Sequence, residues 1–222
     1  MIINPKTVRP EVKYYGPFSE AFRRDAHTLI YWGYKGALSR IKNDSHQETT
    51  LTGYISESII NRLRAFDCPV WCEDFTVKEN PPVQRDGCEG RRRPMPDLII
   101  EGTITGRPEY IFEAKRLKKT DFGIDKYLGS DGLGCFINGK YASRYDEAAM
   151  LGYIQSDFPG YWLTEIQDRI LQKKSDLSLS SLWQKVEIIA ELPDEWPSEH
   201  AREGIERPIF VYHILLDFRP NG

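Results

Sequence analysis

Apolar residues recur along the chain with two different spacings, and each spacing predicts a different kind of element. Over residues 45–66 they return every three or four positions, which places them on one face of a helix. This stripe consists of Leu51, Ile55, Ile59, Leu63 and Phe66. Residues 19–32 and 33–41 are predicted to form one or two further helices. Residues 141–157 and 162–174 are also predicted to be helical.

A strand-like pattern begins after Pro69, where β-branched and aromatic residues alternate with polar ones. The predicted strands cover residues 70–77, 97–104, 109–117, 186–192 and 209–218. A loop over residues 78–96 precedes the second strand, and the turn "TGRP" at residues 105–108 joins the second strand to the third. Turn residues between two strand-like segments predict a β-hairpin.

The order of these elements, helices and three strands followed by a helix and a strand, predicts an α/β or α+β fold in which helices flank a mixed central sheet. With 222 residues, of which 40% are hydrophobic, the chain can bury one sizeable core. We expect a single domain over residues 1–222, with a helical extension at 1–45, the core at 46–192, and a terminal loop and strand at 193–222. The glycine-rich segment 127–142 is expected to be a loop.

Charged residues stand within the predicted hairpin, where burial makes them costly unless they are paired or bind a metal. Alternation puts Glu113 and Lys115 on the same face of the third strand. A turn about Gly106 sets Asp97 opposite Lys115 and diagonal to Glu113, so the three side chains converge. Glu48 continues the apolar stripe of its helix, and we expect it to bring a third carboxylate to the same place.

This set of groups suits phosphoryl-transfer chemistry. Two carboxylates, Asp97 and Glu113, together with the backbone carbonyl of Ala114, provide the oxygen ligands that Mg²⁺ or Mn²⁺ prefers. Lys115 can hold the attacking water or stabilise the negative charge that develops around the phosphorus atom. Glu48 can bind a second ion or orient the lysine. The alternative is an exposed hairpin with a simple Glu–Lys ion pair, and the neighbouring apolar residues argue against it.

The dipeptide Pro96-Asp97, followed on the next predicted strand by Glu113-Ala114-Lys115, resembles the motif of the PD-(D/E)xK phosphodiesterase superfamily of restriction-endonuclease-like nucleases. The resemblance extends to a preceding helix with an inward glutamate and to a following helix with the small residues "YDEAAMLGYIQ". It implies the αβββαβ core of that superfamily for the larger part of the chain.

The resemblance also assigns roles to individual residues. The implied catalytic residues are Asp97, Glu113, Lys115 and Glu48. The implied metal ligands are Asp97, Glu113, the carbonyl of Ala114, and Glu48, with Mg²⁺ or Mn²⁺ as the cofactor.

The function implied by the resemblance is metal-dependent hydrolysis of phosphodiester bonds, leaving a 5′-phosphate and a 3′-hydroxyl. We expect an endonuclease that cuts double-stranded DNA in restriction or anti-phage defence. A homodimer or a defence-complex partner is expected, because cutting both strands of a duplex needs two centres. The alternatives are a catalytically silent nucleic-acid-binding or interaction subunit with the same fold, and an exonuclease or repair nuclease.

The charge of the chain limits how it can bind a polyanion. A net charge of -3 and a pI near 5.9 exclude binding through overall positive charge, so phosphate contacts are expected from local clusters beside the motif. These clusters are Arg91, Arg92 and Arg93 before it, and Arg116, Lys118 and Lys119 after it. A solvated charged surface is the alternative. Gln155, on the helix predicted after the motif, is expected either to orient substrate or a motif side chain or to lie on ordinary surface.

Five other polar residues lie outside the motif and its basic clusters. Tyr141 and Tyr145 are candidates for contact with nucleic acid, or else half-buried packing residues. His200 with Arg202 is a candidate phosphate contact. His213, within an apolar strand, is expected to be a core histidine with a satisfied hydrogen bond.

The four cysteines bear on the cellular compartment. The chain shows no basic-then-apolar leader and no run near the about 20 apolar residues that span a bilayer, so we expect a cytoplasmic protein with reduced thiols and no membrane contact. Cys68, Cys72 and Cys88, with Cys135 or a histidine, are candidate zinc ligands. Small buried hydrophobic side chains are the alternative interpretation.

Overall fold

A mixed sheet forms the centre of the computed structural model, which describes residues 2–3, 19–83, 93–103, 106–121 and 123–220. Within these ranges the sheet has eight strands in the order β1-β6-β7-β8-β5-β4-β3-β2. The strands are β1 (Ile2–Ile3), β2 (Phe75–Glu79), β3 (Leu98–Gly102), β4 (Glu109–Leu117), β5 (Glu147–Ile154), β6 (Leu179–Trp183), β7 (Trp196–Arg202) and β8 (Ile205–Asp217). The predicted class, a mixed sheet with flanking helices, is confirmed.

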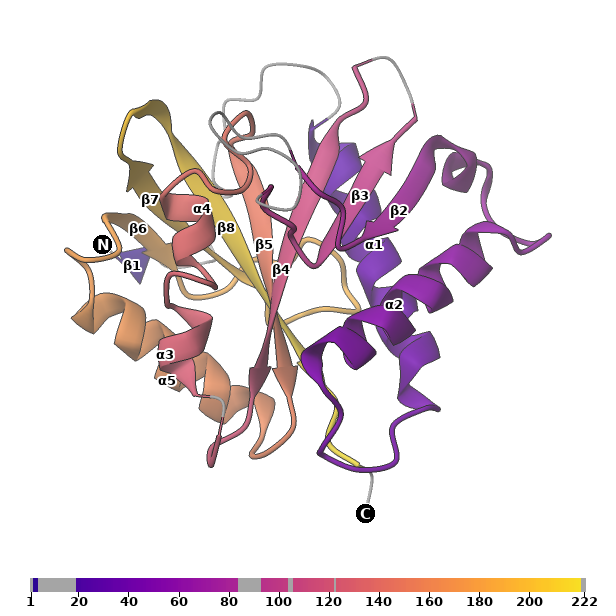
Figure 1. Cartoon of the computed structure of the whole chain (residues 1–222), viewed down its shortest axis with the longest axis horizontal. Helices are drawn as coiled ribbons and strands as arrows, with labels where there is room; N and C mark the ends of the chain where they lie inside the picture. Colours follow the sequence, from indigo (N-terminus) through magenta and orange to yellow (C-terminus); the bar gives the residue numbers. More distant parts are fainter. Residues whose placement is uncertain (1, 4–18, 84–92, 104–105, 122, 221–222) are drawn as a thin grey trace.

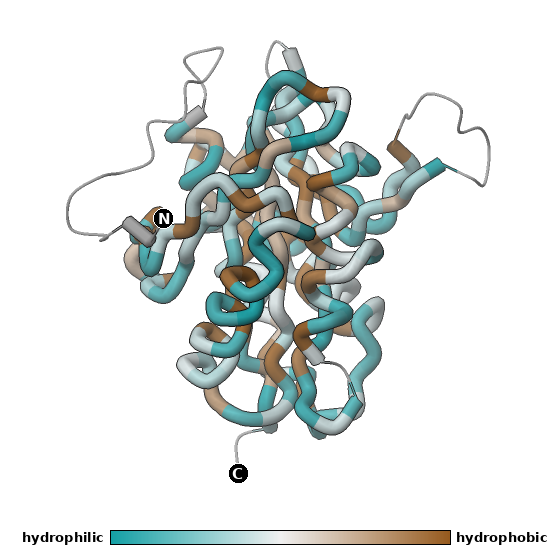
Figure 2. The backbone as a smooth tube through the Cα atoms, turned by 90° about the vertical axis from the view of Figure 1, so that its left-hand side faces the viewer, coloured by the Kyte–Doolittle hydropathy of each residue, from teal (hydrophilic) through white to brown (hydrophobic). Residues whose placement is uncertain are grey.

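Helices cover both faces of the sheet (Figure 1). The helices are α1 (Ser19–Leu38), α2 (Glu48–Leu63), α3 (Ile124–Tyr127), α4 (Gly134–Ile137) and α5 (Pro159–Gln172), with a 3-10 helix η1 (Val70–Asp74). Two separate apolar clusters result, one between the sheet and α1 with α2, the other between the sheet and α3, α4 and α5. Along the described chain, hydrophobic positions occur in short stretches between hydrophilic ones, as an α/β fold with two buried layers requires (Figure 2).

Helix α2 follows the predicted apolar stripe. Leu51, Ile55 and Ile59 are fully buried, and the helix ends at Leu63. Phe66 lies beyond that end and is fully exposed, so its place in the stripe was wrongly predicted. Gly33 lets helices α1 and α2 pack closely, since a Cβ at this position would lie only 2.7 Å from the side chain of Ile59.

The largest error of the sequence analysis concerns residues 141–157, which were predicted to be helical. Residues Glu147–Ile154 instead form strand β5, between β4 and β8 and parallel to both. All eight residues are buried. A strand covered on both faces carries no apolar–polar alternation, so its sequence cannot be told from that of a buried helix by periodicity alone.

Several smaller predictions are also wrong. Residues Val70–Asp74 form the 3-10 helix η1 rather than the start of a strand. Residues 186–192 form no strand, and the buried Ile189 and Leu192 anchor an irregular segment to the core instead. Strands β6 and β7 were not predicted, and the glycine-rich segment 127–142 contains the short helices α3 and α4.

A chain of hydrogen bonds crosses the core beneath β7 and β8. Tyr127 Oη lies 3.0 Å from His213 Nδ1, His213 Nε2 lies 2.8 Å from Ser198 Oγ, and Ser198 Oγ lies 2.7 Å from His200 Nε2. His200 Nδ1 is 2.7 Å from the Leu177 carbonyl, which can only accept a hydrogen bond. We therefore infer that Tyr127 donates to His213, His213 to Ser198, Ser198 to His200, and His200 to Leu177. Both imidazole rings are then neutral.

This arrangement settles two sequence predictions. His213 is a core histidine with satisfied hydrogen bonds, as expected. The expectation of a phosphate contact at His200 and Arg202 is wrong, because both are buried. The Arg202 guanidinium donates to the carbonyls of Arg207 and Ala142 at 2.9 Å.

Protonation of His200 should destabilise the fold. Burial lowers the pKa of His200 from 6.5 to about 4. Between those values the unfolded chain binds a proton that the folded chain does not, so the free energy of unfolding falls as the pH is lowered, by about 1.4 kcal/mol per pH unit. Urea unfolding at about pH 7 and about pH 5 measures this. In His200→Asn the loss should be smaller by about 2 kcal/mol. An equal loss in both proteins would contradict the prediction, and His46→Asn, at a partly exposed site, is the control.

Candidate active site on strands β3 and β4

The register of the hairpin differs from the predicted one. Strands β3 and β4 pair with Leu98 opposite Phe112, so the same register sets Asp97 opposite Glu113 rather than opposite Lys115. The offset is two residues. Because side chains alternate with a period of two, Asp97 keeps the face that it shares with Glu113 and Lys115.

Lys115 stands at the centre of the site. Its Nζ donates to Glu113 Oε1 at 2.8 Å, to Glu48 Oε1 at 3.2 Å and to the carbonyl of Ala114 at 2.6 Å. Burial by itself disfavours the ammonium, but the carboxylates of Glu113, Glu48 and Asp97 outweigh it and raise the pKa of this amine. The lysine is therefore a fixed positive charge rather than a proton carrier.

Asp97 is held by the strand beside it. The Ala114 N–H donates to Asp97 Oδ2 at 2.7 Å, and the side chain is buried. Burial raises the pKa of Asp97, whereas the charge of Lys115 and the Ala114 hydrogen bond act in the opposite direction. The backbone of β4 thus fixes the orientation of this carboxylate.

Glu113 is the most constrained carboxylate of the site. Burial raises its pKa, and the neighbouring charge of Asp97 adds to the rise, while Lys115 opposes it. Oε1 accepts from Lys115, but the buried Oε2 has no hydrogen-bond partner among the described residues. A buried carboxylate oxygen left unpaired is costly, and either a proton, which the raised pKa favours, or a bound ligand relieves that cost.

Glu48 comes from the other side of the sheet. It is the first residue of α2, and its Oε2 accepts from the backbone N–H of Arg116 at 3.1 Å. Its carboxylate therefore ties the start of α2 to strand β4 through Lys115 and Arg116. The predicted convergence of Asp97, Glu113, Lys115 and Glu48 is borne out by these contacts, although the predicted cross-strand partner is not.

The donor atoms of the site determine whether it can hold a divalent cation. No group of three or more metal-binding side chains stands preassembled within the described ranges. Asp97 and Glu113 nevertheless supply hard oxygen ligands, and the unpaired Glu113 Oε2 is of the type that Mg²⁺ or Mn²⁺ prefers. The carbonyl of Ala114 is a further oxygen donor, which here accepts a hydrogen bond from Lys115 Nζ at 2.6 Å. The residues present therefore fit such an ion.

Helix α4 and a cleft border the site. The charge of Glu113 adds to the effect of burial in raising the pKa values of Cys135 and Tyr141, and Tyr141 Oη donates to the Met95 carbonyl at 3.0 Å. Tyr141 is thus a buried packing residue. Beside Lys115 and Glu48, a cleft of about 460 Å³ opens toward α3 and residues 129–131.

The predicted basic clusters have mixed outcomes. Arg91 and Arg92 lie outside the described residues. Arg93, the first described residue after them, is half-buried. Arg116 is buried and its Nη1 donates to the His46 carbonyl at 3.4 Å, so it does not belong to a solvated charge run.

The remaining two lysines of these clusters are engaged on the surface. Lys118 pairs with Asp44 at 3.0 Å. Lys119 is 63% exposed and lies over the ring of Tyr161. Of the cluster after the motif, only Lys119 is mainly solvent-exposed.

Gln155 was placed wrongly by the sequence analysis. It follows strand β5 rather than lying on a helix, and it is buried. Its Nε2 donates to the His46 carbonyl at 2.8 Å, while its Oε1 has no partner among the described residues. Gln155 therefore supports the loop that leads into α2 and Glu48, and the interpretation as ordinary surface is wrong.

The cysteines do not form the expected set of thiols. Cys68 and Cys72 are joined by a disulfide, with their Cα atoms 6.3 Å apart, because the turn after α2 and the helix η1 bring them together. Cys135 is a buried free thiol, and Cys88 lies outside the described residues. The disulfide removes two candidate zinc ligands.

A second buried polar cluster was missed by the sequence analysis. Arg23 Nε donates to both carboxylate oxygens of Glu147 at 3.0 Å. His27 Nδ1 lies 2.8 Å from Glu195 Oε2, and its Nε2 lies 3.2 Å from Tyr110 Oη. The paired residues are 124 and 168 positions apart, so no local pattern could have linked them.

Comparison of the chain with protein-family models, with curated proteins and with solved structures found no match. The family resemblance therefore stands on the motif residues and their geometry. Among the parts of the chain that the structure describes, no helix has the length and apolar character needed to cross a bilayer.

A cation should stabilise the protein through this site. Asp97 and Glu113 repel each other when ionised, so we expect Mn²⁺ at 100 times its dissociation constant to raise the melting temperature by about 5 to 10 °C. The double variant Asp97→Asn/Glu113→Gln should lose this rise, whereas Glu203→Gln, at an exposed turn, should keep it. Differential scanning fluorimetry over a Mn²⁺ titration measures the effect, and an equal rise in all three proteins would place the ion elsewhere.

Proposed function

We propose that this chain is a metal-dependent nuclease that hydrolyses phosphodiester bonds in DNA. The observation that carries the proposal is the buried Glu113 carboxylate, whose Oε2 has no partner among the described residues while its other oxygen contacts Lys115. Asp97 stands across the hairpin from it. Two adjacent buried carboxylates and a lysine have no evident use in a purely structural hairpin.

The order of the elements supports the resemblance to the restriction-endonuclease-like core. Helix α2, the antiparallel strands β2, β3 and β4, and the parallel strand β5 follow one another along the chain. The short helices α3 and α4 lie between β4 and β5 in sequence. This order supports an αβββαβ core only with α3 and α4 as its second helix, because the segment "YDEAAMLGYIQ", to which the resemblance assigned that helix, contains strand β5.

The proposed roles follow from the contacts. Asp97, Glu113 and the Ala114 carbonyl would hold Mg²⁺ or Mn²⁺, which supplies positive charge to the phosphate and to the attacking water when it is bound. The Ala114 N–H fixes the orientation of Asp97. Lys115 would hold the water and stabilise the charge that develops on the phosphate oxygens. Glu48 positions the Lys115 ammonium from the start of α2.

The mode of action and biological setting extend the resemblance further. We propose endonucleolytic cleavage, action in restriction or anti-phage defence, and pairing as a homodimer or within a defence complex. An exonuclease or repair nuclease is the variant of this proposal that would release products from DNA ends, and an end-dependent product ladder distinguishes it.

One observation favours a catalytically silent nucleic-acid-binding subunit instead. Lys115 Nζ donates to the Ala114 carbonyl, and the described residues contain no preassembled group of three metal ligands. A silent subunit would keep the ion pairs as structural links. Cleavage assays with the variants below decide between the two functions.

Loss of the motif side chains should abolish cleavage without unfolding the protein. In a supercoiled-plasmid assay with Mg²⁺ or Mn²⁺, we expect Asp97→Asn, Glu113→Gln and Lys115→Met each to slow nicking by about 100-fold or more. EDTA should stop the wild-type reaction. Lys174→Met, at an exposed position after α5, is the matched control for Lys115→Met. Normal nicking by Glu113→Gln would remove the proposed assignment, and circular dichroism reports whether each variant is folded.

Glu48 should act through Lys115. Glu48→Gln keeps the size of the side chain but removes one of the negative charges that hold the ammonium, so we expect turnover to fall about tenfold. Because the Gln amide can accept from only one of Lys115 Nζ and the Arg116 N–H, the melting temperature should also fall slightly. Glu57→Gln is the control, because Glu57 lies on the same helix and pairs with Arg40 at the surface. Equal turnover of Glu48→Gln and Glu57→Gln would leave Glu48 with only a structural role.

A further inference from the structure

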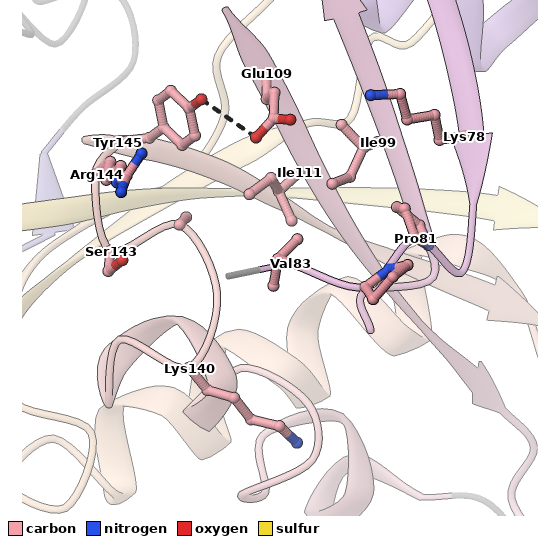
Figure 3. A pocket seen from close by; sticks show the side chains of 12 residues that line it. Lys78, Pro81, Val83, Ile99, Glu109, Ile111, Lys140, Ser143, Arg144 and Tyr145 are labelled. Atoms are coloured by element: carbon pink, nitrogen blue, oxygen red, sulfur yellow. Dashed lines mark hydrogen bonds between the residues drawn. The ribbon is translucent and has the colours of Figure 1, made fainter. Parts of the chain in front are cut away.

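A second cleft, of about 320 Å³, lies on the same face of the sheet as the candidate active site. Its apolar side chains include Pro81, Pro82 and the half-buried Val83, and at its base lie Ile99 and Ile111, which are only 1% and 2% exposed (Figure 3). Ile99 and Ile111 pair directly across strands β3 and β4. The cleft is therefore built on the hairpin that also carries Asp97 and Glu113.

The cleft begins two residues along the strands from the proposed metal ligands. Along β4, Ile111 and Glu113 are successive residues on one face, and Asp97 and Ile99 are successive on the neighbouring strand. Such residues are about 7 Å apart. A substrate with its scissile phosphate at Glu113 thus has a neighbouring unit over Ile111.

The rim of the cleft carries positive charge. Lys78, Lys140 and Arg144 line it, with Lys78 and Arg144 drawn on opposite sides of the hollow in Figure 3. Lys78 pairs with Glu101, and Lys140 lies 3.7 Å from Asp131, so the exposed Arg144 is the rim cation best placed to meet a phosphate. The one acidic side chain of the lining, Glu109, accepts a hydrogen bond from Tyr145 Oη at 3.2 Å. The lining therefore combines apolar side chains with an exposed arginine, which suits a ligand with a flat apolar part and a negative charge.

We infer that this cleft receives an unpaired nucleotide next to the scissile phosphate, its base against the apolar side chains and its phosphate at the rim. This inference rests on the proposed nuclease function. Phosphates alone need no apolar surface, and bases stacked inside an intact duplex cannot reach one. The preferred substrate is therefore single-stranded or locally opened DNA, rather than the fully paired duplex expected from the sequence.

The test measures binding without cleavage. A fluorescein-labelled single-stranded oligonucleotide and the duplex of the same sequence are titrated with protein in EDTA, and anisotropy gives both dissociation constants. We expect the wild type to bind the single strand about tenfold more tightly than the duplex. Ser143→Trp places a large ring in the cleft from an exposed lining position and should remove that preference, whereas Ser143→Ala should keep it.

A second variant, Arg144→Glu, tests the inference even if Ser143→Trp does not fold. Arg144→Glu reverses the charge at an exposed rim position and should weaken single-strand binding about tenfold, with Lys174→Glu, which lies outside the lining, as control. Equal binding of both DNA forms by the wild type would overturn the inference. So would unchanged strand preference in a folded Ser143→Trp variant.

Cleavage of the same two oligonucleotides with Mn²⁺ separates this inference from the nuclease proposal. If the protein prefers single-stranded DNA in a way that depends on Ser143 and Arg144 but shows no metal-dependent cleavage, the nuclease proposal is wrong and the inference about the cleft holds. If the protein cleaves DNA with metal but binds the single strand and the duplex equally, the nuclease proposal holds and the inference about the cleft is wrong.

Discussion

The Lys115 ammonium compensates the negative charge of a buried carboxylate pair, and much of the molecule is arranged around that compensation. Asp97 and Glu113 face each other across the hairpin, and without a nearby cation the ionisation of both buried groups would cost several kcal/mol. The same ammonium reaches Glu48 at the first turn of α2. One positive charge therefore links the helix on one face of the sheet to the carboxylates on the other. A bound divalent cation would share this task, which connects the stability of the site to its occupancy.

Strands β4, β5 and β8 provide the rigid support for that site. They are parallel neighbours in the middle of the sheet, and β5 is buried along its whole length. The ion pair of Arg23 with Glu147 ties α1 to the start of β5, and Gln155 at the end of β5 ties the loop before α2. The two ends of β5 thus hold α1 and α2, the helices that cover the face of the sheet opposite Asp97 and Glu113.

The sequence was informative where a local pattern reflected a local cause. The stripe of α2, the strand Glu109–Leu117 and the shared face of Glu113 and Lys115 follow from periodicities of 3.6 and 2. Strand β5 was mistaken for a helix because burial on both faces removes the alternation that marks a strand. The pairs Arg23–Glu147 and His27–Glu195 could not be predicted, because only the folded sheet brings such distant residues together.

The two-residue register offset has a meaning for how this hairpin can vary. A register shifted by two residues would change the partner of Asp97 yet leave it on the face of Glu113, whereas a shift by one would turn it away. If β3 slips along β4, the two carboxylates therefore stay on the same side only when the slip is an even number of residues. Parity of the register, rather than the exact cross-strand partner, is the constraint that links Asp97 to Glu113 across the hairpin.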